Sequence, residues 1–340
     1  MRKHRHFICL ILGFSSFILF YYKNLRQVIL TPYSPTEVRK FVIAKVNLSN
    51  SAFLVDTSAC KIPNIDPFDK SVKSLLREGT SLKCETKTDL LYIKDKSIHI
   101  NWTEINRSHY KGVIKYCKYD VIFRPYNERQ DHNFLEYTNV SKQFSSHIHI
   151  TDEEFVRVKC YSEDNFVIYM NFFSFVHVKK DVKERCKKNY DKSNDQRKER
   201  LSVLMLGVDS ISRANVMRYM KETRSYLIEK MGAIELLDYN KVADNTFVNI
   251  VPMTTGKYVD ELPWNESIRW TPMDEYNFIW DNYSANGYRT FYAEDAPEIA
   301  IFDFGKSGFQ KPPGDYYNRH FSLAMEKTND IWNTNHYCIH

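Results

Sequence analysis

Residues 201–213 read LSVLMLGVDSISR, and this stretch decides which fold is expected for the second half of the chain. Its first eight residues, Leu201 to Val208, are almost all apolar, which predicts a strand that is covered on both faces. Buried strands of this kind are typical of parallel sheets flanked by helices. Asp209 follows directly, at the carboxyl end of the predicted strand, where the sites of open α/β sheets gather.

Predicted helices and strands alternate along the rest of the chain. We expect a helix over 211–231, a strand over 233–238, a helix from Thr246 to Thr255 ended by Gly256, a helix over 274–286 ended by Gly287, and a strand from Arg289 (RTFYAED). A glycine directly after a helical pattern is a common stop signal. The alternation predicts an α/β domain over 201–340 with a largely parallel sheet.

The segment before this domain has a different composition. Residues 56–180 contain runs rich in Ile, Val, Phe and Tyr, such as DNFVIYMNFFSFVHVKK, with partial alternation of apolar and polar residues. They predict a small β-rich domain, a sandwich, stapled by disulfides. A charged stretch over 181–200 follows, either as a helix or, by preference, as a solvated connector.

The N-terminus has the layout of a membrane-targeting segment. Three basic residues among the first five precede an uncharged, mostly apolar run over 7–22, FICLILGFSSFILFYY. No small-residue cleavage site follows this run, so an uncleaved signal anchor is preferred over a cleaved signal peptide. We therefore expect a cytosolic tip and anchor over 1–22, a stem over 23–55, and a membrane-bound or secreted protein whose bulk is lumenal or extracellular.

Two further patterns agree with export. Six N-x-S/T sequons predict glycosylation at Asn47, Asn101, Asn106, Asn139, Asn265 and Asn282. The cysteines beyond the apolar run form an even set, which in an exported chain predicts disulfides of undetermined pairing: Cys60, Cys84, Cys117, Cys160, Cys186 and Cys338. None has the C-x-x-C spacing of a thiolate zinc site.

The charge balance narrows the class of partner. The net charge of +6 is dispersed among acidic residues and indicates a solvated surface, not a nucleic-acid footprint. The apolar N-terminal run makes a membrane the expected partner, and protein partners stay open.

Two segments carry the candidate chemistry. Asp209 is placed to hold a divalent cation through hard oxygen ligands, although it or Ser210 could simply cap the next helix. Thr246, in KVADNTFVNIVPMTTGK, is a candidate nucleophile at a helix N-terminus, where N–H groups favour anions; capping by Asn245 or Thr246 is again the alternative. Asn249, about one turn onward, could donate to a transition-state oxygen.

Taken together, these motifs resemble the alkaline-phosphatase-like superfamily, and within it an uncharacterised family of exported, often membrane-anchored proteins. The resemblance rests on the G-x-D-S-x-S-R block over 207–213, the DNTF block and the Y-A-E-D block over 292–295. It implies that Asp209 is a metal ligand, Thr246 the nucleophile and Asn249 a contact to phosphate or sulfate. It further implies zinc or calcium as cofactor and a phosphate or sulfate ester as substrate.

The other residues of these blocks have no clear chemical role. Ser210, Ser212 and Arg213 belong to the first block without an assignable role, and Asp295 is a weaker candidate for supporting the metal ligands. Val248 replaces the proline of the T-F-P-N segment that the phosphodiesterase branch of this superfamily has at the same place. Loss of the proline loosens the start of the helix but removes no reacting group.

The resemblance also implies ligands that this sequence does not supply. The superfamily builds a two-metal centre that includes a later D-H-G-type block, and no D-H pair follows Thr246 here. We therefore expect a C-terminally truncated product, or a shortened relative, that resembles metal-dependent phosphoesterases and sulfatases and is incomplete or inactive by itself. One alternative is a non-enzymatic binding glycoprotein. A weaker alternative is a glycan-processing transferase, which is disfavoured because this sequence has no well-placed D-x-D motif.

Overall fold

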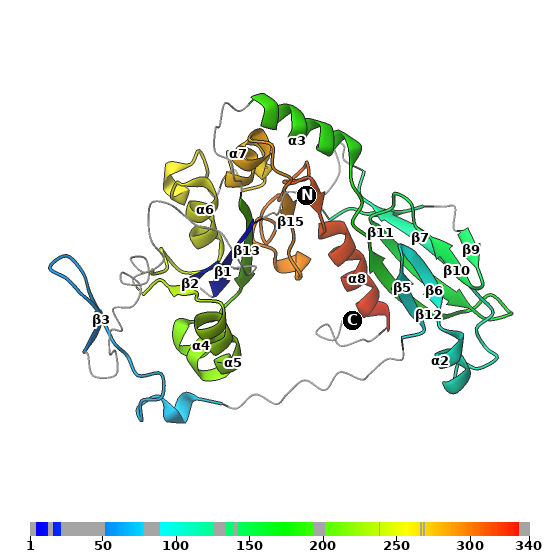
Figure 1. The fold of residues 1–340 in the computed structure, drawn as a ribbon, viewed down its shortest axis with the longest axis horizontal. Helices are drawn as coiled ribbons and strands as arrows, with labels where there is room; N and C mark the ends of the chain where they lie inside the picture. Colours follow the sequence, from blue (N-terminus) through cyan, green and yellow to red (C-terminus); the bar gives the residue numbers. More distant parts are fainter. Residues whose placement is uncertain are drawn as a thin grey trace. The chain divides into compact units, whose positions relative to one another are not determined.

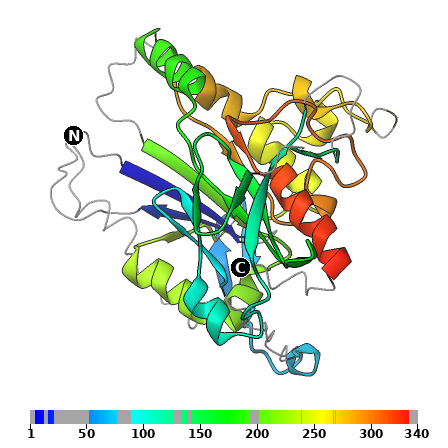
Figure 2. The ribbon, with the colours of Figure 1, turned by 90° about the vertical axis from the view of Figure 1, so that its right-hand side faces the viewer.

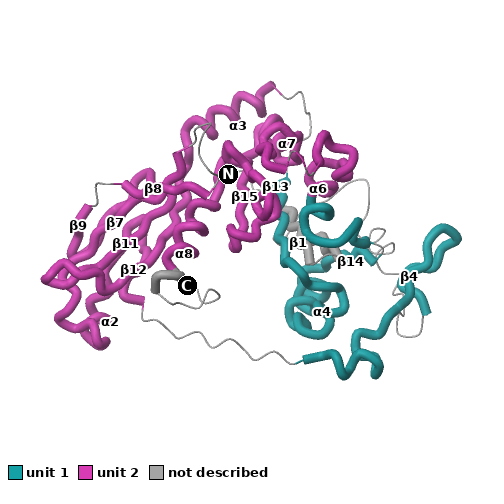
Figure 3. Tube along the Cα trace, turned by 180° about the vertical axis from the view of Figure 1, so that it is seen from behind, with its two compact units in different colours: residues 1–79, 195–250 teal, residues 80–194, 251–340 magenta. Residues whose placement is uncertain are grey.

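The structure of the chain is a computed structural model that describes residues 5–12, 16–21, 52–77, 89–125, 133–138, 142–192, 201–237, 239–265, 267 and 269–332. The fold mixes helices with several small sheets, as expected for the α/β class (Figure 1). The chain divides into two compact units, each built from two separate segments (Figure 3). Unit 1 combines 1–79 with 195–250, and unit 2 combines 80–194 with 251–340.

Unit 1 contains a four-stranded sheet in the order β13-β1-β2-β14. The predicted strand is β13 (Leu201–Val208), which runs parallel to β1 (Arg5–Leu12), as Figure 2 shows. Both β1 and β14 (Ile234–Glu235) run antiparallel to β2 (Ser16–Tyr21), so the sheet is mixed and not largely parallel as expected. A separate hairpin joins β3 (Phe53–Asp56) to β4 (Lys61–Pro63).

The prediction that β13 is covered on both faces is wrong. Its central residues are 39–49% exposed: Val203, Leu204, Met205 and Leu206. Helical segments follow the strand, as predicted for 211–231: α4 (Arg213–Tyr219), α5 (Lys221–Ser225) and the π-helix η4 (Tyr226–Lys230). The small core that they build includes Val216 and Leu227 and takes in only Val208 from β13, so it covers only the end of the strand.

Unit 2 contains the β-rich part of the chain, which forms two sheets. A five-stranded sheet has the order β12-β11-β7-β8, with β9 also paired to β7, and a three-stranded sheet has the order β10-β6-β5. The strands are β5 (Leu91–Lys94), β6 (Ser97–Ile100), β7 (Tyr116–Phe123), β8 (Glu136–Tyr137), β9 (Lys142–Phe144), β10 (His147–His149), β11 (Phe155–Tyr161) and β12 (Val167–Ser174). β5 and β6 meet at Asp95 and Lys96, both at positive φ, as a two-residue type I′ hairpin requires.

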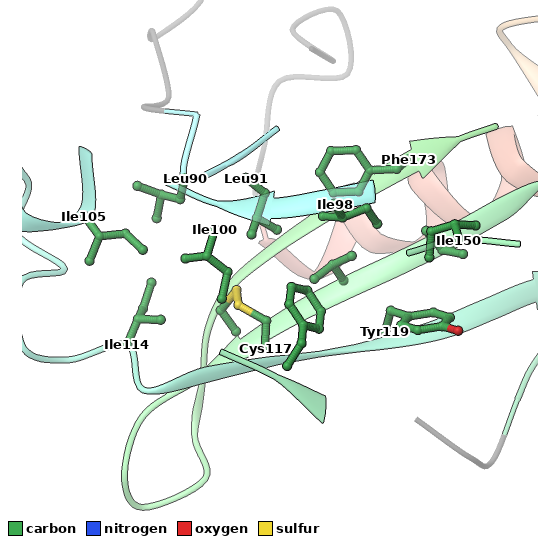
Figure 4. Packing of buried hydrophobic residues seen from close by; sticks show 14 of the residues in the cluster. Leu90, Leu91, Ile98, Ile100, Ile105, Ile114, Cys117, Tyr119, Ile150 and Phe173 are labelled. Carbon is green, nitrogen blue, oxygen red and sulfur yellow. A yellow bond between two sulfur atoms is a disulfide. The ribbon is translucent and has the colours of Figure 1, made fainter. Parts of the chain in front are cut away.

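The two sheets share one apolar core, which agrees with the expected sandwich. Ile98 and Ile100 of the smaller sheet lie in the same buried cluster as Val158 and Phe173 of the larger sheet (Figure 4). Within this core Cys117 of β7 and Cys160 of β11 are directly opposite and form a disulfide. Cys60 and Cys186 carry thiols, and Cys84 and Cys338 lie outside the described residues. The predicted disulfide stapling is therefore confirmed for one pair.

The rest of unit 2 is largely helical. The charged stretch forms the helix α3 (Lys180–Lys192) and not the solvated connector that was preferred. It is helical because Val182 and Cys186 give it a buried side. α6 (Phe247–Thr255) begins in unit 1 and continues into unit 2, and it ends before Gly256, which has the positive φ of a helix stop, as predicted. The other elements of unit 2 are α2 (Trp102–Arg107), η5 (Val259–Glu261), η7 (Met273–Glu275), α7 (Ile279–Ala285), β15 (Phe291–Tyr292), η8 (Pro297–Ile299), β16 (Tyr316–Tyr317) and α8 (Arg319–Trp332), whereas η3 (Lys73–Leu75) belongs to unit 1.

Gly287 ends α7 as expected, and it also lies against the backbone of α3. Its φ is +81°, and a Cβ built there lies 2.7 Å from the Cys186 carbonyl oxygen and 2.9 Å from the Tyr190 amide nitrogen. We expect Gly287→Ala to destabilise the protein by about 2–4 kcal/mol, from left-handed backbone strain and overpacking together. Urea denaturation of the full chain measures the change. Gly305→Ala is the control, because Gly305 has a φ of +64° but open space around its Cβ. It should therefore lose only the part of the stability that comes from left-handed backbone strain.

The expected membrane anchor remains a prediction. Residues 5–12 and 16–21 are extended in this structure. Across the described ranges, no helix combines the length and apolar character that a membrane crossing requires. Most of the expected stem, residues 23–51, lies outside the described residues.

The sequon asparagines differ in exposure. Asn106, Asn265 and Asn282 are exposed. Asn101 is half-buried, and its side chain accepts from the Glu104 amide and caps α2. Asn47 and Asn139 lie outside the described residues. Glycosylation therefore remains a prediction at all six sites.

Candidate functional site

The block that follows β13 places Asp209 at the end of the strand with its side chain exposed. The next residue, Ser210, has a φ of +57°, so the chain turns sharply there. The hydroxyl oxygen of Ser212 accepts from the Asn215 amide and caps α4. The structure therefore assigns helix capping to Ser212, and neither Asp209 nor Ser210 has that role.

Thr246 lies at the start of α6. Its carbonyl oxygen accepts from the amides of Asn249 and Ile250, at 3.1 and 3.0 Å, and so opens the helix. Asn245, immediately before it, has a φ of +69°, a conformation that asparagine tolerates better than most residues. The Thr246 hydroxyl donates to Asp209 Oδ1 at 3.4 Å. The structure thus brings together two residues that the sequence analysis selected separately.

Asn249 lies beside this pair and shapes the loop before Thr246. Its side-chain oxygen accepts from the Val242 amide at 2.6 Å. Its side-chain nitrogen donates to the carbonyl oxygens of Ala243 and Asn245, at 2.8 and 2.6 Å. These bonds hold the loop around Thr246, so in this structure Asn249 is a positioning residue. A direct contact to substrate would require some of these bonds to be exchanged.

Arg213, which had no assignable role, takes part in an ion-pair cluster. Arg213 and Arg224 both pair with the Glu235 carboxylate, the latter at 2.7 Å, and all three side chains are largely shielded from solvent. Glu235 belongs to β14, so the cluster fixes the start of α4 and the end of α5 to the sheet. Local structure therefore accounts for Ser212 and Arg213 of the first block, through a helix cap and an ion pair.

The Y-A-E-D block lies in unit 2, where its two acidic residues differ in exposure. Asp295 is exposed, whereas Glu294 is largely buried, and burial raises its pKa. The Tyr292 hydroxyl donates to Glu294 Oε1 at 2.6 Å, and the Ile301 amide donates to Oε2 at 2.8 Å. Glu294 lies just after the short strand β15, in an irregular segment, so no periodic pattern in the sequence marked it as the acidic residue that faces inward.

The metal-binding capacity of the pair can be tested on its donor atoms. Asp209 and Thr246 offer two oxygens, the ligand type that hard divalent cations prefer, close enough to contact one ion together. In the part of the chain that the structure describes, no three His, Cys, Asp or Glu side chains are grouped so that they could hold a metal. The pair therefore fits part of a coordination sphere and does not complete one.

Comparison with known proteins places the chain in a family. Residues 77–340 match the family described as "Protein of unknown function (DUF229)", and the chain belongs to that family. No curated protein and no solved structure matches it.

Proposed function

We propose that this chain carries the nucleophile side of a metal-dependent ester hydrolase site, and that its family belongs to the alkaline-phosphatase-like superfamily. The observation that carries the proposal is the contact between Thr246 Oγ1 and Asp209 Oδ1, across 37 positions of sequence. Two left-handed residues, Ser210 and Asn245, adjoin the pair, and such strained positions cluster at functional sites.

Thr246 has the environment of a nucleophile for an anionic substrate. Its hydroxyl adjoins the first turn of α6, whose N–H groups and dipole favour a phosphate or sulfate group. Thr246 Oγ1 would form a bond to phosphorus or sulfur while the ester oxygen leaves as an alcohol, and water would then release phosphate or sulfate. Asp209 would hold a divalent cation such as zinc or calcium, whose positive charge would favour the ionised form of the Thr246 hydroxyl. The role of Asn249 is to hold the loop that orients Thr246.

We further propose that this site works on the lumenal or extracellular side of a membrane. Three exposed sequon asparagines and the Cys117–Cys160 disulfide support export, since glycans and disulfides both belong to the secretory pathway. The apolar run over 7–22 supports a membrane anchor.

The test is an assay of the full chain, secreted from a eukaryotic host, with p-nitrophenyl phosphate, bis-p-nitrophenyl phosphate and p-nitrophenyl sulfate in the presence of zinc, calcium or magnesium. We expect slow, metal-dependent turnover of at least one ester, because the described residues supply only two ligand atoms. Thr246→Ala and Asp209→Asn should each reduce it at least 100-fold. Thr223→Ala, on the exposed side of α5, is the matched control and should stay within twofold.

A covalent intermediate can be detected separately by mass spectrometry after acid quenching, as a phosphoryl or sulfuryl group on the peptide that contains Thr246. Turnover that survives Thr246→Ala contradicts the proposed nucleophile. A folded wild-type chain with neither turnover nor labelling contradicts the enzyme proposal and supports a non-enzymatic binding glycoprotein.

A further inference from the structure

The larger sheet of unit 2 is hollowed beside β7. A cavity of about 400 Å³ lies there, lined by residues of β7, β8 and β9 and of the segment just before β11. All of these elements belong to unit 2, whereas Asp209 and Thr246 belong to unit 1. The lining of the cavity includes Tyr119, Val121, Phe123, Glu136, Lys142 and Glu153.

The strand register explains why these side chains line one trough. Tyr119, Val121 and Phe123 are alternate residues of β7, so all three side chains leave the same face of the sheet. Lys142 of β9 is directly opposite Tyr119, and Glu136 of β8 is directly opposite Phe123. Directly opposite residues share a face, so the trough has charged groups at both ends, about 13 Å of strand apart, and apolar residues between them.

Glu153 adds a fixed negative charge at the Tyr119 end of the trough. Its Oε1 accepts from the Tyr119 hydroxyl at 3.0 Å, and its Oε2 accepts from the Thr151 and Asp152 amides, both at 3.1 Å. Burial opposes ionisation of Glu153, but the hydrogen bonds from backbone amides and from Tyr119 outweigh it and lower its pKa. The carboxylate is therefore ionised at neutral pH and held in one orientation.

Glu136 and Phe123 form the other end of the trough. The Glu136 side chain is half-buried, and the Phe123 ring is 36% exposed. Directly opposite side chains on neighbouring strands have Cβ atoms about 5 Å apart, so this carboxyl group and this ring can contact the same ligand group. A carboxylate and the face of an aromatic ring both attract cations. This end of the trough therefore favours a cation as well.

We propose that the trough binds a linear aliphatic diamine or polyamine, with one ammonium group at each glutamate and the methylene chain along Val121 and Phe123. Such a molecule is charged at its ends and apolar between them, which is the pattern of the lining. Each ammonium group would form charge-assisted hydrogen bonds to a carboxylate, and the methylene groups on the apolar floor would be removed from water. An uncharged chain of the same length would leave both glutamates without a cation.

Lys142 brings a positive charge to the Tyr119 end and opposes a cation there. Its side chain is exposed and long enough to place the ammonium group in solvent, so it weakens binding without filling the trough. The Asp120–Arg157 ion pair is on the opposite face of the sheet, because Asp120 lies between two lining residues of β7. Removing the Lys142 charge should therefore tighten binding, which distinguishes a cationic ligand from an anionic one.

The proposal is tested by isothermal titration calorimetry of the full chain with octamethylenediamine at pH 7.5 and physiological salt. We expect Glu136→Gln to weaken binding at least tenfold, because it removes one charged end of the trough and keeps its shape. Lys142→Gln should tighten binding two- to fivefold. Glu163→Gln is the matched control: its side chain is 82% exposed on the turn between β11 and β12, and the affinity should change less than twofold.

Two further ligands test the charge and the spacing. Octamethylene glycol has the same length without the charges and should show no measurable binding. Putrescine is too short to reach both carboxylates and should bind at least tenfold more weakly than octamethylenediamine. Glu153→Gln should weaken binding of the long diamine as Glu136→Gln does, and Glu136→Gln is the decisive variant because Glu153 also holds the turn over 151–153.

Circular dichroism and urea denaturation of each variant report folding. Equal affinity for the diamine in folded wild-type and Glu136→Gln chains overturns the proposal, as does a wild-type chain that binds no diamine. Weaker binding by Lys142→Gln, or glycol that binds as tightly as the diamine, overturns it too. Asp209→Asn should leave the affinity unchanged, which separates this site from the proposed hydrolase site.

Discussion

Arg319→Met is expected to destabilise the protein by about 3–5 kcal/mol, because it leaves a buried carboxylate without its counter-ion. Arg319 begins α8 and is only 4% exposed, and its Nε lies 3.2 Å from Oδ1 of Asp303, which is 7% exposed. Its other nitrogens donate to the Pro297 carbonyl and the Asn133 side-chain oxygen, both at 2.7 Å. The substitution therefore removes one charge and two hydrogen bonds from the interior of unit 2.

The pKa of Asp303 shows how strongly this site resists an unpaired charge. Burial raises it from 3.8 to about 6 even though Arg319 opposes the shift. Removing Arg319 should raise this pKa further. Urea denaturation of the full chain measures the loss of stability. Arg107→Met, which removes the exposed Arg107–Glu104 ion pair, is the control and should lower the free energy of unfolding by about 0.5 kcal/mol or less.

A double-mutant cycle tests the pairing itself. Arg319→Met combined with Asp303→Asn should cost less than the sum of the two single losses, since neither partner is then left as an uncompensated buried charge. Additive losses would show that the two side chains are not coupled, against the 3.2 Å ion pair.

His320→Phe is expected to change how stability depends on pH. Burial, with Arg124 and Lys179 adding to it, lowers the pKa of His320 from 6.5 to about 4. The folded state therefore binds fewer protons than the unfolded state between these values. The stability that His320 contributes is complete above pH 6.5 and falls by about 3 kcal/mol as the pH drops to 4.

Phenylalanine removes this titration and keeps the aromatic contact, because the His320 ring meets Phe155 edge to face at 4.8 Å. Between pH 7 and pH 4 the variant should gain about 3 kcal/mol relative to wild type, measured by urea denaturation at each pH. Asp303 acts in the opposite sense, since its raised pKa gives a contribution that is lost as the pH rises through 6, and it is present in both proteins. His109→Gln is the control, and a variant whose curve parallels wild type contradicts the prediction.

Local patterns were sufficient to predict several elements and their ends. The apolar run over 201–208 is β13, the helix before Gly256 is α6, and the helix before Gly287 ends there. These predictions succeeded because a strand, a helix stop and a left-handed glycine depend on residues close together in the chain. The β-rich character of 56–180 was also predicted, from its composition and partial alternation of apolar and polar residues.

Pairing and burial could not be predicted in the same way. From its apolar sequence, β13 was expected in a largely parallel sheet with both faces covered, but its sheet is mixed and its central residues are half exposed. A solvated connector was preferred over a helix where α3 has two buried residues. Each of these properties depends on which distant segment lies alongside.

The sequence by itself determined the residue types available for chemistry: an acidic residue after a strand, a threonine at a helix start, six sequons and an even set of cysteines. Only the tertiary structure decided which of them meet. It joined Thr246 to Asp209 and Cys117 to Cys160. The physical reason is that a contact between distant residues depends on strand register and helix docking, which the packing of the whole core sets and no local pattern encodes.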